Sequence, residues 1–261
     1  MPGERLRILH LTDLHLRRSL PGTAQQPKRL SRDMPNILCR LGDRLNEWSP
    51  DVITLTGDLL DVPDEVVDGR LAKEDPEANA AAISNAGKDY LWMRDWLDGT
   101  GRHFVVIPGN HDHRGAFLTA FGSVSPELSI SGYQFIGFDD NLDDRRTPER
   151  PETELSRFSD AVGRTEPQVH LQHYTLRPRL HRHTPYSYKP DAALADDLEK
   201  SGHVRLVLSG HYHPGAYARS NGGVVYSTAP AFCESPFRFR LVDLAGPYDI
   251  NVVNVSLGWD D

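Results

Sequence analysis

Short apolar runs alternate along this chain with longer segments in which apolar residues recur at helical spacing. Apolar runs of strand length occupy residues 6–11, 52–56 and 103–107, and a polar residue follows each of them within three positions. Residues 33–48 carry apolar side chains every three or four positions, which predicts an amphipathic helix. A second helix is expected over residues 77–97. This alternation is typical of an α/β fold built from βαβ units.

The second half of the chain continues the alternation and then changes its character. Further strands are expected at residues 133–138, 169–172 and 204–208, and helices at 152–162 and 191–200. The last part, at residues 223–227, 238–242 and 249–257, has the polar and apolar alternation of antiparallel strands. The pattern therefore predicts a mixed sheet or two packed sheets.

Composition narrows the class of protein. With 261 residues and 38% hydrophobic residues, the chain is long enough for a sizeable core, and we expect one domain over residues 1–261. Two cysteines, Cys39 and Cys233, cannot form a disulfide framework, and the first residues lack a secretory pattern. We therefore expect a cytoplasmic protein. No apolar run approaches the roughly 18 residues that a membrane span needs.

The charge of the chain bears on its partners. The formal net charge is -8, whereas proteins that follow a nucleic-acid backbone normally show a basic stripe. A nucleic-acid partner is therefore disfavoured, and a small phosphorylated substrate fits better. The sequence leaves the oligomeric state open, a dimer included.

Polar motifs follow the ends of the expected strands. They are Asp13-Leu14-His15, Gly57-Asp58-Leu59-Leu60-Asp61, Gly109-Asn110-His111-Asp112, the single His173, and Gly210-His211-Tyr212-His213. Carboxylate, imidazole and amide groups of this kind are what two adjacent divalent metal ions need. Each motif alone is weak, but the ordered series at successive strand ends is a strong signal of a metal-dependent phosphoesterase.

This series resembles the calcineurin-like metallophosphoesterase superfamily, whose pattern is D-x-H, G-D-x-x-D, G-N-H-D, a single His, and G-H-x-H. The pattern is closest to the cyclic-nucleotide phosphodiesterase-like branch. The resemblance covers residues 13–213 and implies a four-layer αββα sandwich with two mixed β-sheets. It places the metal site at the carboxyl-terminal edge of the strands.

The resemblance also implies a set of metal ligands. Asp13, His15 and His213 would hold one ion, Asn110, His173 and His211 would hold the other, and Asp58 would bridge both. Such a mixture of imidazoles and carboxylates suits Mn, Fe or Zn, as divalent or mixed-valence ions, better than Mg or Ca. A hydroxide shared by the two ions would then attack phosphorus directly.

Two further residues belong to the expected chemistry. The resemblance implies that His111 faces the substrate and protonates or stabilises the leaving oxygen, and we expect Asn110 to contact the substrate as well. Asp61 resembles the acidic residue that orients His111. An Asp three residues after another is equally often a turn residue or a helix cap, so both interpretations of Asp61 stay open.

Two charged segments lie outside these motifs. Residues 177–189 are the most basic part of the chain, and we expect Arg177, Arg179 or Arg182 to pair with phosphate and Tyr186 or Tyr188 to stack on a base or ring. A solvated loop is the alternative. The acidic residues 64–77 could form a lid over the site, although such a run is more often a solvated loop.

Departures from related patterns limit the substrate class. Protein serine/threonine phosphatases continue G-D-x-x-D with Arg-Gly, whereas this chain has Val62-Pro63, which disfavours a protein phosphatase. Many cyclic-nucleotide hydrolases have His-His-Pro where this chain has His173-Tyr174-Thr175. The leading interpretation is a phosphodiesterase acting on a cyclic nucleotide or a glycerophosphodiester. The alternative is a phosphomonoesterase or nucleotide pyrophosphohydrolase; a nuclease or an inactive binding protein is less favoured.

Overall fold

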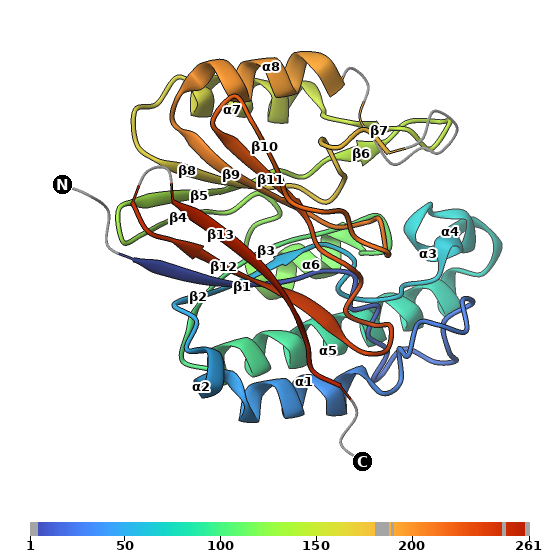
Figure 1. Ribbon diagram of the computed structural model, residues 1–261. Coiled ribbons are helices and arrows are strands. Elements are labelled where there is room, and N and C mark those ends of the chain that lie inside the picture. The colour runs from blue at the N-terminus through green and yellow to red at the C-terminus, as the bar shows by residue number, and fades with distance from the viewer. Residues whose placement is uncertain (1–4, 181–187, 189–190, 247–248, 259–261) are drawn as a thin grey trace.

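The strands form two large sheets that pack face to face, and helices cover the outer face of each (Figure 1). The computed structural model describes residues 5–180, 188, 191–246 and 249–258. The resulting order of layers is helices, sheet, sheet, helices. The predicted four-layer αββα sandwich with two mixed sheets is confirmed.

The first sheet has five strands in the order β13-β12-β1-β2-β3. Its parallel half consists of β1 (Leu6–Leu11), β2 (Val52–Thr56) and β3 (His103–Ile107). Two antiparallel strands, β12 (Arg238–Leu244) and β13 (Ile250–Ser256), extend it on the other side of β1. The first and the last parts of the chain therefore share one sheet.

The second sheet has six strands in the order β10-β11-β9-β8-β5-β4. The strands are β4 (Glu127–Ile130), β5 (Tyr133–Gly137), β8 (Gln168–Leu171), β9 (Val204–Ser209), β10 (Arg219–Asn221) and β11 (Val224–Thr228). The four central strands are parallel and the two edge strands are antiparallel to their neighbours. A separate two-stranded hairpin, β6 (Asn141–Leu142) and β7 (Pro148–Glu149), lies beyond the end of β5.

Helices pack on both outer faces. On the five-stranded sheet lie α1 (Met34–Asp43), α5 (Pro76–Gly99) and α6 (Arg114–Phe121), and on the six-stranded sheet lie α7 (Glu152–Val162) and α8 (Asp191–Ser201). The short helices are α2 (Leu45–Trp48), α3 (Asp64–Val67) and α4 (Arg70–Glu74). The long helix α5 begins where the Asp75 carboxylate accepts a hydrogen bond from the Ala78 N–H at 2.9 Å, a normal N-terminal cap.

The alternation of side chains along the strands explains the layers. In β1, Leu6 and Ile8 join the cluster between the two sheets, whereas Leu9 and Leu11 join the cluster beneath the helices. Successive side chains of a strand point to opposite faces, so each central strand supplies both layers of the core. This is why residues 6–11 and 52–56 carry apolar side chains on both faces of their strands instead of on one face alone.

Most predicted elements are confirmed to within a few residues, with informative exceptions. The expected helix over residues 33–48 is divided at Arg44 into α1 and α2. The acidic stretch over residues 64–77 forms α3, α4 and the start of α5. Helix α6 was not predicted. No helix among the described residues is long and apolar enough to cross a membrane. Cys39 and Cys233 are both free.

The buried histidine His170 offers a test of this packing. Its ring lies against Phe138 and Phe158, with centroids 5.1 and 6.1 Å away, and its Nε2 lies 2.7 Å from Gln168 Oε1. Burial, with a smaller effect of the Arg150 charge, lowers the pKa of His170 to about 3. His170 in the unfolded chain therefore binds a proton below its ordinary pKa of about 6.5, whereas His170 in the folded protein stays neutral until the pH is much lower.

We predict that His170 makes the protein less stable as the pH falls from about 6.5 toward 3, by up to about 1.4 kcal/mol per pH unit. Urea unfolding of the metal-free protein at several pH values should show a shallower acid dependence for His170→Gln than for the native chain. Replacement of the exposed His103 by Gln is the control. Equal slopes for native protein and His170→Gln would contradict the prediction.

Candidate metal centre

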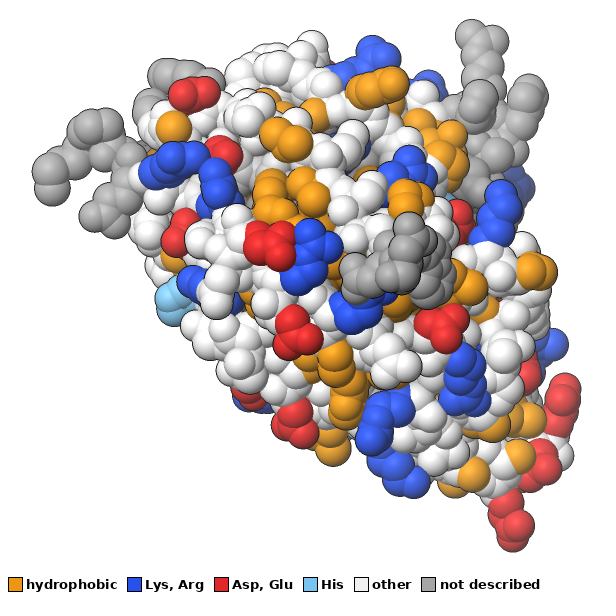
Figure 2. All heavy atoms as spheres, turned by 60° about the horizontal axis from the view of Figure 1, so that its bottom comes forward, with side chains coloured by type: hydrophobic (Ala, Val, Ile, Leu, Met, Phe, Trp, Pro, Cys, Tyr) orange, Lys and Arg blue, Asp and Glu red, His pale blue; other side chains and the backbone are white. Residues whose placement is uncertain are grey.

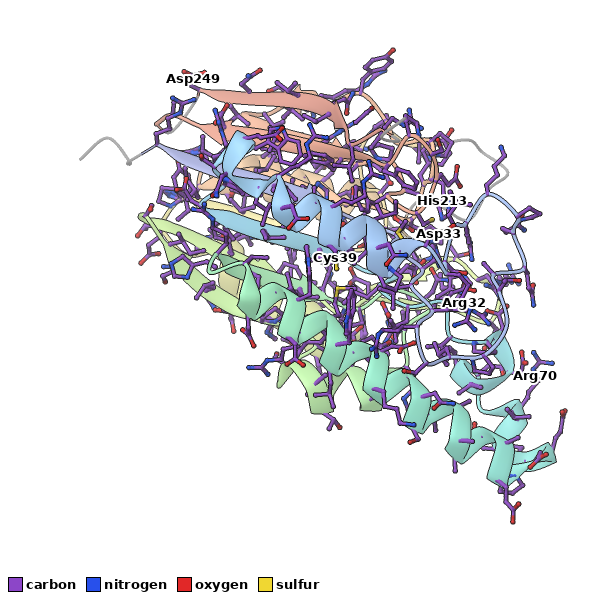
Figure 3. All side chains as sticks on the ribbon, turned by 90° about the horizontal axis from the view of Figure 1, so that it is seen from below. Arg32, Asp33, Cys39, Arg70, His213 and Asp249 are labelled. Carbon is purple, nitrogen blue, oxygen red and sulfur yellow. The ribbon has the colours of Figure 1, made fainter. Side chains whose placement is uncertain are left out.

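The candidate ligands all follow the carboxyl-terminal ends of strands. Asp13 and His15 follow β1, Asp58 follows β2, Asn110 follows β3, His173 follows β8, and His211 and His213 follow β9. The first three strands belong to one sheet and the other two belong to the second sheet. The residues therefore meet where corresponding edges of the two sheets face each other, and Figure 3 shows His213 at this end of the molecule.

The backbone around the ligands is unusual. Asp13, His15, Asp58 and His211 all have positive φ values, of 52°, 45°, 52° and 64°. This left-handed region costs a residue other than glycine about 1–3 kcal/mol, and it persists only where the surrounding structure enforces it. Here backbone hydrogen bonds do so, for example from Asp13 N to Gly57 O at 3.0 Å and from His15 N to Asp58 O at 2.9 Å.

Two motif glycines are required by close approach. A β-carbon at Gly109 would collide with the carboxylate and the backbone N of Asp58, and one at Gly210 would collide with the side chains of Thr12 and Asp13. Only glycine lets these turns pass so close to the carboxylates. The glycines in the motifs therefore keep the loops from separate strands in contact.

One group of donor atoms comes from Asp13, His15 and His213. Asp13 Oδ1 lies 3.5 Å from His213 Nε2 and 3.8 Å from His15 Nε2, and the two imidazole nitrogens are 3.3 Å apart. These atoms lie within 4.8 Å of one another. They are the three residues that the family resemblance assigns to the first ion.

A second group comes from Asp58, His173 and His211, again with donor atoms within 4.8 Å of one another. His173 Nε2 lies 3.3 Å from Asp58 Oδ2 and 3.2 Å from Asn110 Oδ1. Asp58 Oδ2 is also 3.6 Å from His15 Nε2 in the first group. Asp58 therefore lies between the two groups, as a bridging residue must.

The electrostatics of the site are dominated by two buried carboxylates. Burial alone would raise the pKa of Asp13 and of Asp58, but the surrounding imidazoles, with His213 and His173 the strongest respectively, lower both pKa values below the ordinary range. Both side chains are therefore ionised. Burial lowers the pKa of His15 to about 4 and of His211 to about 3, so both rings are neutral near pH 7.

His173 differs from the other imidazoles. Burial would lower its pKa, but the neighbouring Asp58 raises it to about 9. A cation bound at Asp58 would take the place of this proton, because an imidazole binds a metal ion only in its neutral form. Metal binding at this site should therefore release a proton.

The residues present fit a pair of transition-metal ions. Asp13 Oδ1 is buried and makes no hydrogen bond within the described residues. The other oxygen of this carboxylate, Oδ2, accepts hydrogen bonds from Thr12 Oγ1 at 2.7 Å and from His211 N at 2.9 Å. A buried carboxylate oxygen without a donor is costly. A cation between Asp13, His15 and His213 would satisfy it.

His111 and Asp61 lie beside the two groups. The His111 N–H donates to Asp58 Oδ1 at 2.8 Å, and the ring is half-buried. Asp61 Oδ1 is 3.8 Å from His111 Nδ1 and 3.3 Å from His15 Nδ1. His15, Asp61 and His111 also have donor atoms within 4.8 Å of one another.

Asp61 is already paired with two guanidinium groups, which makes it a poor cation ligand. Arg17 approaches it at 2.7 Å and Arg29 at 3.1 Å. Burial would raise the pKa of Asp61, but His15 and the neighbouring cations hold it well below its ordinary range, so the carboxylate is ionised and its charge is compensated. The role of Asp61 in orienting His111 stays a prediction, and its position next to His15 gives it a second partner.

A cavity of about 460 Å³ opens onto these residues. Its described walls include Asp58, Asn110, His111, His211 and His213, together with Lys28, Arg29, Arg146 and Glu234. Neither Arg177 nor Arg179 is among these wall residues; Arg177 Nε lies 3.9 Å from Glu199 Oε1 instead. Arg182 and Tyr186 lie outside the described residues. The expectation that Tyr188 could stack on a substrate ring is wrong, because its side chain is buried in the core and its hydroxyl donates to Asp140.

Comparison with known proteins supports the interpretation of the motifs. The family profile of calcineurin-like phosphoesterases matches residues 6–215. The chain belongs to this family. It is 24% identical over 236 residues to a probable cyclic nucleotide phosphodiesterase of Synechococcus, an alignment that covers 87% of this chain and 80% of the relative.

Solved structures show the same fold at low sequence identity. A dimetal phosphatase from Danio rerio superposes with a TM-score of 0.63 at 13% identity, covering 98% of this chain and 100% of the other. The protein TT1561 of Thermus thermophilus gives 0.60 at 14% identity, covering 97% and 100%. GAP50, the anchor in the inner membrane complex of Plasmodium, gives 0.59 at 12% identity, covering 97% and 85%.

As a member of this family, the chain is a metallophosphoesterase, and partners outside the motifs orient its candidate ligands. His173 Nδ1 donates to the Thr56 carbonyl at 2.7 Å, and His213 Nδ1 donates to Glu234 Oε1 at 2.7 Å. Each bond leaves Nε2 facing the centre. Neither partner can be recognised from the sequence, because one is a backbone atom and the other, Glu234, lies 21 positions after His213.

Asp112 holds the two loops that carry Asp58 and Asn110. Its buried carboxylate accepts hydrogen bonds from the N–H groups of Gly109, Leu59 and Leu60 at 2.8, 3.1 and 3.1 Å, and from the Tyr90 hydroxyl at 2.8 Å. Asp112, the fourth residue of the G-N-H-D motif, therefore stabilises the two loops that carry the candidate ligands.

We predict that Glu234→Ala weakens metal binding by about 10- to 100-fold, because His213 loses the partner that fixes its tautomer and orientation. Isothermal titration of the metal-free protein with Zn²⁺ or Mn²⁺ measures the effect, and Glu234→Gln should restore part of it through its carbonyl oxygen. Glu152→Ala, at an exposed position of α7, is the control. An unchanged metal affinity in Glu234→Ala would refute the assignment.

Proposed function

We propose that the chain is a two-metal-ion phosphodiesterase acting on a small diester such as a cyclic nucleotide or a glycerophosphodiester. The observation that carries the proposal is the convergence of seven donor residues, with Asp58 between two groups and an unsatisfied Asp13 oxygen facing the first. The Synechococcus relative, named a probable cyclic nucleotide phosphodiesterase, supports the diester class.

The assignment of ligands follows the two groups. Asp13, His15 and His213 would hold one ion, Asn110, His173 and His211 the other, and Asp58 both. Mn, Fe and Zn suit this set of imidazole and carboxylate donors. When bound, two such ions would lower the pKa of a water shared between them and polarise the phosphoryl oxygens.

His111 would act on the leaving group. Its backbone is fixed by Asp58 at 2.8 Å, and its ring reaches the cavity that the metal ligands line. Arg29 Nη1 lies 3.5 Å from His111 Nε2, so a leaving oxygen near this nitrogen would meet both an acid and a fixed positive charge.

A phosphomonoesterase or nucleotide pyrophosphohydrolase is the second candidate, because the same metal pair would support either reaction. On the face drawn in Figure 2, acidic and basic side chains are interspersed and form no basic stripe. Together with the net charge of -8, this favours a small substrate over a nucleic acid.

We predict that the metal-loaded protein hydrolyses bis-p-nitrophenyl phosphate faster than p-nitrophenyl phosphate. Asp58→Asn should lower kcat about 1,000-fold or more, because the bridging charge is lost, whereas Asp98→Asn on the exposed face of α5 should leave it unchanged. The absorbance of the released p-nitrophenolate measures both rates. A preference for the monoester would favour the second candidate.

We predict that the loss caused by His111→Gln depends on the leaving group. An alkoxide needs a proton to depart, so kcat for 3′,5′-cyclic AMP should fall about 100-fold. A p-nitrophenolate departs without one, so the loss with bis-p-nitrophenyl phosphate should stay below about tenfold. Equal losses on both substrates would show that His111 does not act as the acid.

A further inference from the structure

Cationic side chains from two separate segments share the cavity of the candidate metal centre. Lys28 and Arg29 come from the segment between β1 and α1, and Arg146 comes from the turn between β6 and β7. Both segments lie at the edge of the sheets where the ligands converge (Figure 1). None of these residues belongs to the motif series.

Arg29 is held in place beside His111. Its Nη1 donates to Asp61 Oδ1 at 3.1 Å and lies 3.5 Å from His111 Nε2. Its Nε is buried and has no hydrogen-bond partner in the described part of the chain. Arg29 therefore has donor capacity left, and its position is fixed by a carboxylate that Arg17 also pairs.

Arg146 is presented by a hairpin that is anchored in the core. Arg150, directly after β7, is buried and pairs with Asp140 through Nε at 2.7 Å and Nη2 at 3.0 Å, and its guanidinium lies 4.1 Å from the centre of the Phe138 ring. Within the turn, the Asp143 carboxylate accepts bonds from the backbone N–H groups of Arg145 and Thr147 at 2.9 and 2.7 Å. The turn is therefore positioned by buried contacts.

Positively charged side chains also line a second cavity, on the other side of His111. A smaller cavity of about 210 Å³ on that side is lined by Arg17, Arg29 and Arg146 as well as by Asp61 and Asp64. Within the described residues, neither Lys28 nor Arg146 forms an ion pair. Arg29 and Arg146 thus line both cavities, and His111 lies at the boundary.

We propose that Lys28, Arg29 and Arg146 form a subsite for a second phosphate group of the substrate, an inference that rests on the proposed phosphodiesterase function. A singly charged diester would have its charge balanced at the metal centre alone. Three further cations beside it match an additional phosphate, which guanidinium groups bind through paired hydrogen bonds. The substrate class is therefore a small phosphodiester that carries a second phosphate group.

Direct binding tests the subsite without relying on turnover. Isothermal titration of the manganese-loaded protein, with manganese in excess over nucleotide, compares AMP with ADP and with adenosine 3′,5′-bisphosphate. ADP carries its second phosphate directly on the first, and adenosine 3′,5′-bisphosphate carries it on the opposite side of the ribose. We expect at least one of the two to bind about tenfold or more tightly than AMP. Arg146→Ala should remove most of this gain, and Arg146→Lys should keep part of it.

Arg145→Ala is the matched control, because Arg145 neighbours Arg146 in the same turn but does not line either cavity. Arg145→Ala should still bind the doubly phosphorylated probe more tightly than AMP. The proposal is overturned if neither doubly phosphorylated probe exceeds AMP, if the gain survives in Arg146→Ala, or if Arg145→Ala removes it equally. Hydrolysis of bis-p-nitrophenyl phosphate without any such gain would refute the subsite alone. The gain without any hydrolysis would refute the proposed function alone.

Discussion

The burial of two ionised carboxylates within one cluster of imidazoles is the constraint on which this structure depends. Asp13 and Asp58 are 0% and 1% exposed, and an isolated charge in such a place would be too costly to keep. Two kinds of interaction compensate them, the backbone N–H groups of His211 and His111 and the neighbouring imidazoles, and bound cations would add a third. The strained loop conformations and the motif glycines follow from the need to bring these groups together.

The sequence carried much of this information because ligands and strand ends are local features. A β-branched or leucine-rich run such as residues 52–56 specifies a buried strand, and the residue that follows a parallel strand lies at a predictable edge of the sheet. The resemblance of the motifs to a known family then supplied the pairing of residues into two groups, which spacing alone could not supply. The division of the helix at Arg44 had no comparable signal, because the apolar spacing continues through it.

Contacts between segments that are distant along the chain could not be predicted from the sequence, for a physical reason. The Thr56 carbonyl that orients His173 carries no side-chain signature, and Glu234 is one acidic residue among many. Arg29 and Arg146 lie in loops whose paths are set by tertiary contacts such as the buried pair of Arg150 with Asp140. Arg177, by contrast, was singled out because its neighbours are basic, and local charge density does not determine which way a loop faces.

Val62-Pro63, which stands where protein serine/threonine phosphatases have Arg-Gly, now has a structural explanation. Val62 is 1% exposed and packs in the core cluster with Val66 of α3, while its N–H donates to the His111 carbonyl at 3.2 Å. A cation at this position would therefore replace an apolar side chain of the core cluster at the wall of the smaller cavity. Arg29 approaches the same corner from another segment and pairs with Asp61, the residue just before Val62. The candidate metal ligands and the cations proposed to bind a second phosphate thus come from different parts of the chain, because the former follow strand ends and the latter lie in loops between elements.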